Sequence, residues 1–202
     1  MQKVNKLIVY LVLTLGIVYT NNAQDKKKAN NTEVMIMENT NNTVDTAIFA
    51  SGCFWGTEYY FKKLKGVVST EVGYIGGTIK NPAYREVCTG RTGHAEATRV
   101  LYNSTEISFE ELCKYFFETH DPTQINRQGP DIGTQYRSEI FYLTNEQKEI
   151  SEKLITILEE KGLKIATKVT PATTFYSAED YHQNYYNIKG GTPYCHRYIK
   201  RF

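Results

Sequence analysis

Patterns typical of strands and helices alternate along this chain between residues 47 and 186, and their order restricts the folds that the chain can adopt. Short apolar or alternating runs are followed by stretches that open on helix caps and carry apolar residues at helical spacing. Strands are predicted at 47–50, 67–74, 97–102, 138–143 and 165–169, and helices at 54–65, 109–118, 145–161 and 178–186. The β-α-β, β-α-β order with late additions favours an α+β fold, a two-layer sandwich with helices on one face of a mixed sheet.

Two long irregular stretches interrupt this order, at about 76–93 and 120–135. Loops of this length inside a domain are usually functional. Placed at the same side of the sheet, they would surround the N-terminus of the first predicted helix with a pocket. A site is therefore expected where residues 47–50 lead into that helix.

The N-terminal part of the chain is predicted to lie outside the folded domain. Residues 1–23 match a secretory signal, with two early lysines, an uncharged apolar run at 7–19 and a small residue for cleavage at Ala23. Residues 24–45 are polar and lack a period, as in a flexible linker, so the domain is expected at 46–202. We expect export to a periplasmic or extracellular location, with an uncleaved membrane anchor as the alternative.

Charge narrows the range of partners. The formal net charge is +2, and Lys3 and Lys6 are the only charged residues before Gln24, so the chain without its predicted signal is neutral. A neutral protein has no electrostatic basis for binding nucleic acid. It also has none for stable membrane association once the signal is removed.

Cys53 stands in the segment 52–56, between a predicted strand and the predicted helix 54–65, with Phe54 and Trp55 directly after it. Unpaired N–H groups and the positive end of the helix dipole stabilise a thiolate at such a position. They are expected to lower the pKa of the thiol from about 8.5 into a range of roughly 3.5 to 7.5. A buried, inert core cysteine is the competing interpretation, because free cysteine is often a small hydrophobe.

The other cysteines are Cys88, Cys113 and Cys195, and none forms a Cys-x-x-Cys pair. A zinc site is therefore not expected, and no other metal or cofactor is indicated. Cys113 lies in an apolar stripe at helical spacing and is predicted to pack in the core. Cys88 lies in a predicted loop and is interpreted as structural.

Three further segments carry polar side chains that could reach the predicted pocket. Tyr84 lies in 81–86, Glu96 in 92–97, and Asp131 and Tyr136 in 129–138. Spacing alone makes Glu96 an exposed carboxylate at a strand edge, since charged residues are mostly exposed. Together with 52–56, however, these segments closely resemble the A-type peptide methionine sulfoxide reductases over about 48–195. The resemblance implies the ferredoxin-like fold of that family.

The resemblance also implies a reaction, the thiol-dependent reduction of the S-epimer of methionine sulfoxide, free or in oxidised proteins, as repair after oxidative stress. Cys53 corresponds to the nucleophile that attacks sulfur, and Glu96 to the acid that protonates the sulfoxide oxygen. The other matching positions are Tyr84 and Tyr136 as hydroxyl donors to that oxygen, Asp131 in the same polar set, and Phe54 and Trp55 as rings around the substrate methyl group. Attack leaves a sulfenic acid on Cys53, which a second thiol must resolve.

Cys195 is the expected resolving cysteine, because many family members use a C-terminal cysteine in this way. It follows the glycine-bearing segment 190–194, and only 196–202 come after it, without the longer extension of some relatives. A thioredoxin-like reductant is expected to recycle the disulfide. Direct reduction of Cys53 by an external thiol is the alternative if Cys195 lies too far away.

Two other functions remain open from the residues alone. A secreted cysteine hydrolase or acyltransferase would pair Cys53 with His94 or His182 and an aspartate. A methionine-binding module would keep an inert thiol. The aromatic residues Tyr181, Tyr185 and Tyr186 are predicted to pack the last helix rather than to bind a ligand.

Overall fold

The computed structural model describes residues 43–202. The predicted secretory signal at 1–23 and nearly all of the predicted linker at 24–45 lie outside the described residues. The first strand, β1 (Val44–Ser51), begins inside the last part of that predicted linker. Within the described residues, no helix combines the length and the apolar character that crossing a membrane requires.

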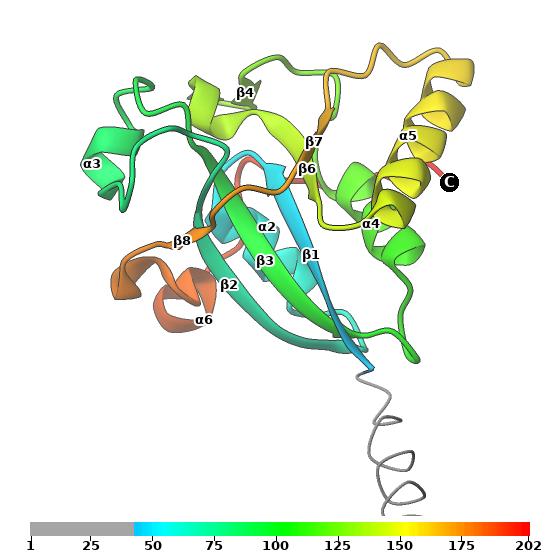
Figure 1. Cartoon of the computed structure of the whole chain (residues 1–202), viewed down its shortest axis with the longest axis horizontal. Coiled ribbons are helices and arrows are strands. Elements are labelled where there is room, and N and C mark those ends of the chain that lie inside the picture. The colour runs from blue at the N-terminus through cyan, green and yellow to red at the C-terminus, as the bar shows by residue number, and fades with distance from the viewer. Residues whose placement is uncertain (1–42) are drawn as a thin grey trace, which may run out of the picture. The chain divides into compact units, whose positions relative to one another are not determined.

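A six-stranded sheet forms the centre of the domain, in the order β7-β6-β1-β3-β2-β8 (Figure 1). Its strands after β1 are β2 (Val67–Ile75), β3 (Ala95–Asn103), β6 (Ser138–Tyr142), β7 (Lys168–Pro171) and β8 (Tyr176–Ser177). All neighbouring strands pair antiparallel except β6 and β7, which are parallel. The mixed sheet and its helices confirm the predicted α+β class.

Three helices cover one face of this sheet: α2 (Phe54–Phe61), α4 (Phe109–Thr119) and α5 (Asn145–Glu160). The alternation along β1 decides which residues meet them, since successive strand residues point to opposite faces. Phe49 faces the helices, and its ring lies 5.0 Å from that of Phe61 and 5.2 Å from that of Phe116. Its neighbours Ile48 and Ala50 belong to a separate core cluster that the segment after β7 covers as it crosses the sheet toward β8 (Figure 1).

The predicted last helix, 178–186, is wrong. The chain instead forms a 3₁₀ turn (Asp180–His182) and a short helix, α6 (Tyr185–Lys189), separated by Asn184 in the left-handed region at φ 55°. Tertiary hydrogen bonds break the helix. The Gln183 side chain bonds to both the N–H and the carbonyl of Val72, and the Asn184 N–H donates to Glu58 Oε2 at 2.8 Å.

The long irregular stretches contain short elements that the sequence patterns did not predict. These are α3 (Tyr84–Val87), β4 (Arg127–Gln128), β5 (Asp131–Ile132) and the 3₁₀ turn η1 (Thr134–Tyr136). Figure 1 shows α3 and β4 at the same end of the sheet, where β1 leads into α2. The expectation that both stretches lie at this side is confirmed.

Candidate active site

Cys53 is the N-cap residue of α2, directly after β1, as predicted. Gly52 makes the turn between strand and helix at φ 99°, in the left-handed region that favours glycine. A Cβ added there would lie 2.5 Å from the Gln128 Cβ on β4. The close passage of β4 thus fixes the turn that presents the thiol.

The electrostatic prediction for Cys53 is wrong in sign. A hydrogen bond shared with Cys195 and then burial raise the pKa of the Cys53 thiol well above its ordinary value, although the Trp55 backbone N–H lowers it. The helix terminus acts as expected, but a second thiol and the loss of water outweigh it. Cys53 is only 6% exposed and Cys195 8%, so two buried thiols lie in contact.

Docking of the C-terminal tail brings Cys195 to this position. The Tyr194 hydroxyl donates to both oxygens of Asp131, at 3.0 and 3.2 Å. Beyond the cysteine, the N–H groups of Arg197 and Ile199 donate to carbonyls at the end of α4. The tail is therefore held on both sides of Cys195. Cys195 lies in contact with Cys53 and not too far away from it, which was the condition for direct reduction by an external thiol.

Glu96 is a buried carboxyl on β3, not the exposed strand-edge residue that its spacing suggested. It is 1% exposed because β3 lies between β1 and β2. Burial, and then the neighbouring Cys53, raise the pKa of Glu96 well above its ordinary value. Its Oε2 accepts the Phe54 N–H at 3.2 Å, whereas Oε1 has no hydrogen-bond partner within residues 43–202. The site therefore favours the protonated form of Glu96 and leaves one of its oxygens without a partner among these residues.

Tyr84 and Tyr136 bring hydroxyls to this carboxyl from the two irregular stretches. Tyr84 opens α3 and Tyr136 ends η1. Burial, followed by the charge of Glu96, raises the pKa of each phenol above its ordinary value. Both phenols therefore stay protonated and can donate hydrogen bonds beside Glu96. Asp131 lies at the edge of the same group, and its charge also raises the pKa of Tyr136.

Phe54 and Trp55 form an aromatic wall behind Cys53. Phe54 is 1% exposed, and the Trp55 ring stacks on Tyr185 with centroids 3.7 Å apart. The Trp55 Nε1–H donates to His182 Nδ1 at 3.1 Å. Tyr185 and His182 therefore position the wall, and the sequence patterns missed this role. Tyr185 begins α6 and packs against Trp55, so the predicted packing role holds for this residue although the helix predicted around it is broken.

His94 and His182, the two histidines considered for a hydrolase, form hydrogen bonds with groups other than Cys53. Both ring nitrogens of His94 bond to backbone atoms of the loop after β2, at Gly77 and Ile79. His182 accepts from Trp55, and burial lowers the pKa of its ring. In the described part of the chain, neither ring hydrogen-bonds Cys53. The same residues contain no group of three or more His, Cys, Asp or Glu side chains arranged to hold a metal ion.

The two remaining cysteines differ in their environment. Cys113 is fully buried on α4, and its thiol lies 3.8 Å from the Ser151 hydroxyl, which confirms the predicted core packing. Cys88 is the exposed C-cap residue of α3, and its thiol shares a hydrogen bond with Tyr84. Its structural interpretation stays a prediction.

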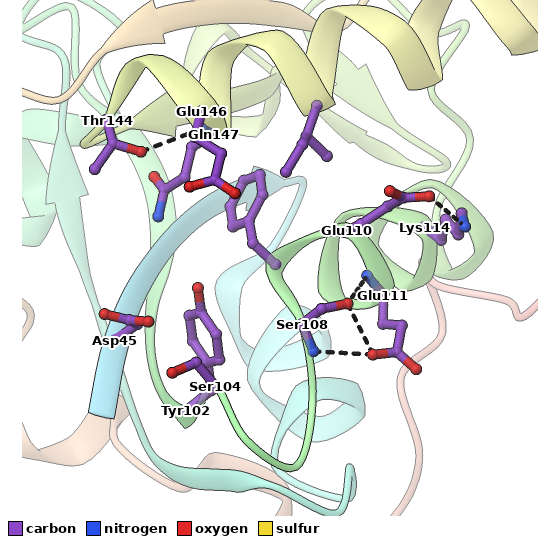
Figure 2. A pocket seen from close by; sticks show the side chains of 12 residues that line it. Asp45, Tyr102, Ser104, Ser108, Glu110, Glu111, Lys114, Thr144, Glu146 and Gln147 are labelled. Carbon is purple, nitrogen blue, oxygen red and sulfur yellow. Dashed lines mark hydrogen bonds and ion pairs between the residues drawn. The ribbon is translucent and has the colours of Figure 1, made fainter. Parts of the chain in front are cut away.

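A cavity of about 550 Å³ lies away from all of these residues, where the N-termini of α4 and α5 approach β1 and β3 (Figure 2). Two of its carboxylates have structural roles. Glu111 caps α4 through Ser108, and Glu110 pairs with Lys114 at 2.6 Å. Acidic side chains stabilise helix N-termini, which accounts for these two carboxylates in the first turn of α4.

His196 lies behind the two thiols and depends on Gly56 for space. An added Cβ at Gly56, in the first turn of α2, would lie 2.2 Å from His196 Nδ1. Alanine is the better helix former by about 1 kcal/mol. Overpacking a buried contact costs about 1 to 3 kcal/mol. We therefore expect Gly56→Ala to lower the free energy of unfolding in a urea titration, by up to about 2 kcal/mol.

A double-mutant cycle tests this cause. In a His196→Ala background the ring is gone, and Gly56→Ala should then be neutral or stabilising. An equal loss of stability in both backgrounds would show that the clash with the imidazole is not the reason.

A buried thiol that contacts a second thiol and lies near a carboxyl of raised pKa, on a ferredoxin-like α+β sheet, defines a thiol-dependent oxidoreductase. The model of the family "Peptide methionine sulfoxide reductase" matches residues 45–202. The chain belongs to this family and reduces methionine sulfoxide by thiol chemistry.

Relatives support this assignment over most of the chain. Peptide methionine sulfoxide reductase MsrA of Deinococcus radiodurans is 54% identical over 154 residues, which cover 75% of each chain. The structure of reduced Mxr1 from Saccharomyces cerevisiae has a TM-score of 0.73 at 37% identity, covering 80% of this chain and 94% of that one. Mxr1 in complex with Trx2 has a TM-score of 0.53 at 28% identity, covering 78% and 91%.

Proposed function

We propose that the protein reduces the S-epimer of methionine sulfoxide, free or in oxidised proteins, with Cys53 as nucleophile and Glu96 as acid. The free Oε1 of a protonated, buried Glu96 beside the Cys53 thiol carries this proposal. A sulfoxide oxygen leaves sulfur readily only when it is protonated as the sulfur is attacked. A carboxyl that keeps its proton and has an unused oxygen suits that task.

The first step transfers one oxygen atom. The Cys53 sulfur attacks the substrate sulfur while Glu96 donates its proton to the sulfoxide oxygen. The oxygen passes to the Cys53 sulfur as the S–O bond of the substrate and the transient bond between the two sulfurs break, so methionine leaves and Cys53 becomes a sulfenic acid. The substrate sulfur is reduced and the Cys53 sulfur is oxidised. The thiol proton of Cys53 replaces the one that Glu96 gave, so the carboxyl is regenerated.

Selection of one epimer follows from three separate contacts. The hydroxyls of Tyr84 and Tyr136 donate to the oxygen as negative charge develops on it. Phe54 and Trp55 enclose the methyl group, and Cys53 approaches the sulfur. Because the oxygen and methyl sites are fixed relative to the nucleophile, only one handedness at sulfur leaves the rest of the methionine pointing toward solvent.

Cys195 resolves the sulfenic acid in this proposal. Its contact with Cys53 in the reduced protein places the second thiol within reach without a large movement of the tail. The product is a disulfide between the two cysteines, which a thioredoxin-like reductant reduces. The structure of Mxr1 with Trx2 supports this class of partner.

We also propose that the protein works outside the cytoplasm, as a repair enzyme under oxidative stress. The basic start and the apolar run at 7–19 support a secretory signal that is cleaved after Ala23. An N-terminal membrane anchor is the alternative. Sequencing the N-terminus of the protein after expression with its leader distinguishes a start at Gln24 from an intact leader.

The proposal is tested with separated epimers of methionine sulfoxide, dithiothreitol and the Cys195→Ser variant. The wild-type protein should consume only the S-epimer. Without reductant, Cys195→Ser should release about one equivalent of methionine at the wild-type rate. With thioredoxin as the reductant, its turnover should fall by at least about a hundredfold because no disulfide can form. Conversion of the R-epimer would contradict the three-contact argument, and undiminished thioredoxin-dependent turnover would remove Cys195 from the cycle.

A further inference from the structure

The step in which Cys195 resolves the sulfenic acid requires a proton acceptor. A thiol attacks as its thiolate, so the proton of Cys195 must leave as the new S–S bond forms. The Cys195 thiol lies in contact with His196, whose Nδ1 is 3.1 Å from its sulfur. In residues 43–202 no other ring nitrogen and no carboxylate hydrogen-bonds this thiol.

The surroundings of the His196 ring favour one tautomer. Nε2 lies 3.5 Å from the Ser51 Oγ and 3.4 Å from the Thr57 Oγ1, and the ring also bonds to the Ser51 backbone. A proton on Nε2 has these oxygens to donate to. In that tautomer the lone pair of Nδ1 faces the Cys195 thiol.

We propose that His196 is the general base of disulfide formation, taking the Cys195 proton on Nδ1 as the Cys195 sulfur attacks the sulfenic acid on Cys53. The inference rests on the proposed resolving role of Cys195. The S–O bond on Cys53 breaks as the S–S bond forms, and the leaving oxygen takes a proton from the imidazolium and departs as water. The Cys195 sulfur is oxidised, the Cys53 sulfur is reduced, and His196 returns to its neutral form.

Burial disfavours the protonated form of His196, so the ring releases a proton soon after it has accepted one. It is 5% exposed, and burial lowers the pKa of its ring to about 4. The imidazolium therefore exists only while the bond forms, and the carboxylate of Asp131 stabilises its charge. The other titratable groups that face the ring are Cys195 on its own segment, Tyr60 on α2 and His120 at the end of α4.

The test uses His196→Asn and His196→Gln in single turnovers with S-methionine sulfoxide. The asparagine oxygen can still accept a hydrogen bond near the position of Nδ1, and the glutamine amide reaches toward Ser51 and Thr57. Neither can take the proton. Samples quenched with an alkylating reagent report released methionine and the Cys53–Cys195 disulfide separately.

We expect both variants to release methionine at about the wild-type rate and to form the disulfide about a hundredfold more slowly near neutral pH, the low end for general-base catalysis. The pH profile should change as well. Wild-type disulfide formation should be flat above about pH 6, because His196 with a pKa of about 4 is neutral there. The variants should speed up about tenfold per pH unit, since an unaided thiol must ionise first.

Disulfide formation at the wild-type rate in both variants would overturn the inference. So would a slowing that is equal at every pH, because a purely structural defect does not depend on ionisation of the thiol. Wild-type protein that released methionine without forming a disulfide would overturn the resolving role of Cys195 and the inference with it. Absence of methionine in the wild-type reaction would instead overturn the proposed function.

Discussion

Cys53→Ser should abolish the reduction of methionine sulfoxide, lowering the single-turnover rate by more than about 10⁴-fold. A serine hydroxyl is a far weaker nucleophile than a thiol and cannot carry the oxygen atom as a sulfenic acid. The buried position suits serine in size, so the loss should not come from unfolding. Release of methionine in one turnover, followed by chromatography, measures the effect directly.

Cys113→Ser is the matched control for this experiment. Cys113 is also a buried thiol, but it packs on α4 beside the Ser151 hydroxyl, which can bond to a serine. Its activity should remain within about twofold of wild type, since substitutions without contact to the reacting atoms leave the barrier unchanged. Cys53→Ser protein that still released methionine, in a sample free of wild type, would show that another group attacks the sulfur.

Glu96→Gln should slow the first step by about 10² to 10⁴-fold, the range that a positioned general acid contributes. The wild-type rate should also fall as pH rises through the raised pKa of Glu96, because only the protonated carboxyl can give a proton. The glutamine variant has no such proton, so its residual rate should lack this dependence on Glu96. Single-turnover release of methionine across pH measures both effects.

The same substitution should raise stability, which separates loss of chemistry from loss of fold. In the wild type, folded Glu96 keeps a proton that the unfolded chain releases above about pH 4.5, so stability falls with rising pH until the raised folded pKa is reached. Glutamine cannot titrate. Its advantage in the free energy of unfolding should therefore grow by about 1.4 kcal/mol per pH unit in that window.

Glu58→Gln provides the comparison for activity. Glu58 is buried and its pKa is also raised by burial, but both of its oxygens are bonded, to Thr70 and to the Asn184 N–H. It should lose far less activity than Glu96→Gln, since it has no free oxygen facing Cys53. Equal losses in the two variants would mean that buried carboxyls in general, and not an acid at the sulfoxide, explain the effect.

Local sequence patterns predicted the elements whose stabilising contacts are local. The capping pairs Ser108 with Glu111 and Thr144 with Gln147 place the starts of α4 and α5 correctly, because each pair lies within one helical turn. The helix predicted at 178–186 fails for the opposite reason. Two of its backbone N–H groups donate to partners far away in sequence, that of Ala178 to the Val72 carbonyl and that of Asn184 to Glu58 Oε2.

The site, like the fold, could be predicted from the sequence only in part. The residue types and their order, from Cys53 to Cys195, were sufficient to indicate the family, and the family model and relatives confirm it. The protonation of those residues was not predictable from spacing. The pKa of Cys53 rises because Cys195 and burial outweigh the helix terminus, and that of Glu96 rises because β3 lies inside the sheet.

The sequence by itself determined the order of the longer strands and helices before residue 170, the α+β class, the strand-to-helix turn that presents Cys53, and the set of residues that resembles one family. These follow from periodicity, capping and side-chain chemistry, which act over a few neighbouring residues. Only the tertiary structure decided that the two thiols touch, that the pKa of Glu96 is raised and one of its oxygens has no partner among residues 43–202, and that His196 lies next to Cys195. Such properties depend on burial and on contacts between distant segments, because the loss of water sets both the protonation state and the strength of each hydrogen bond.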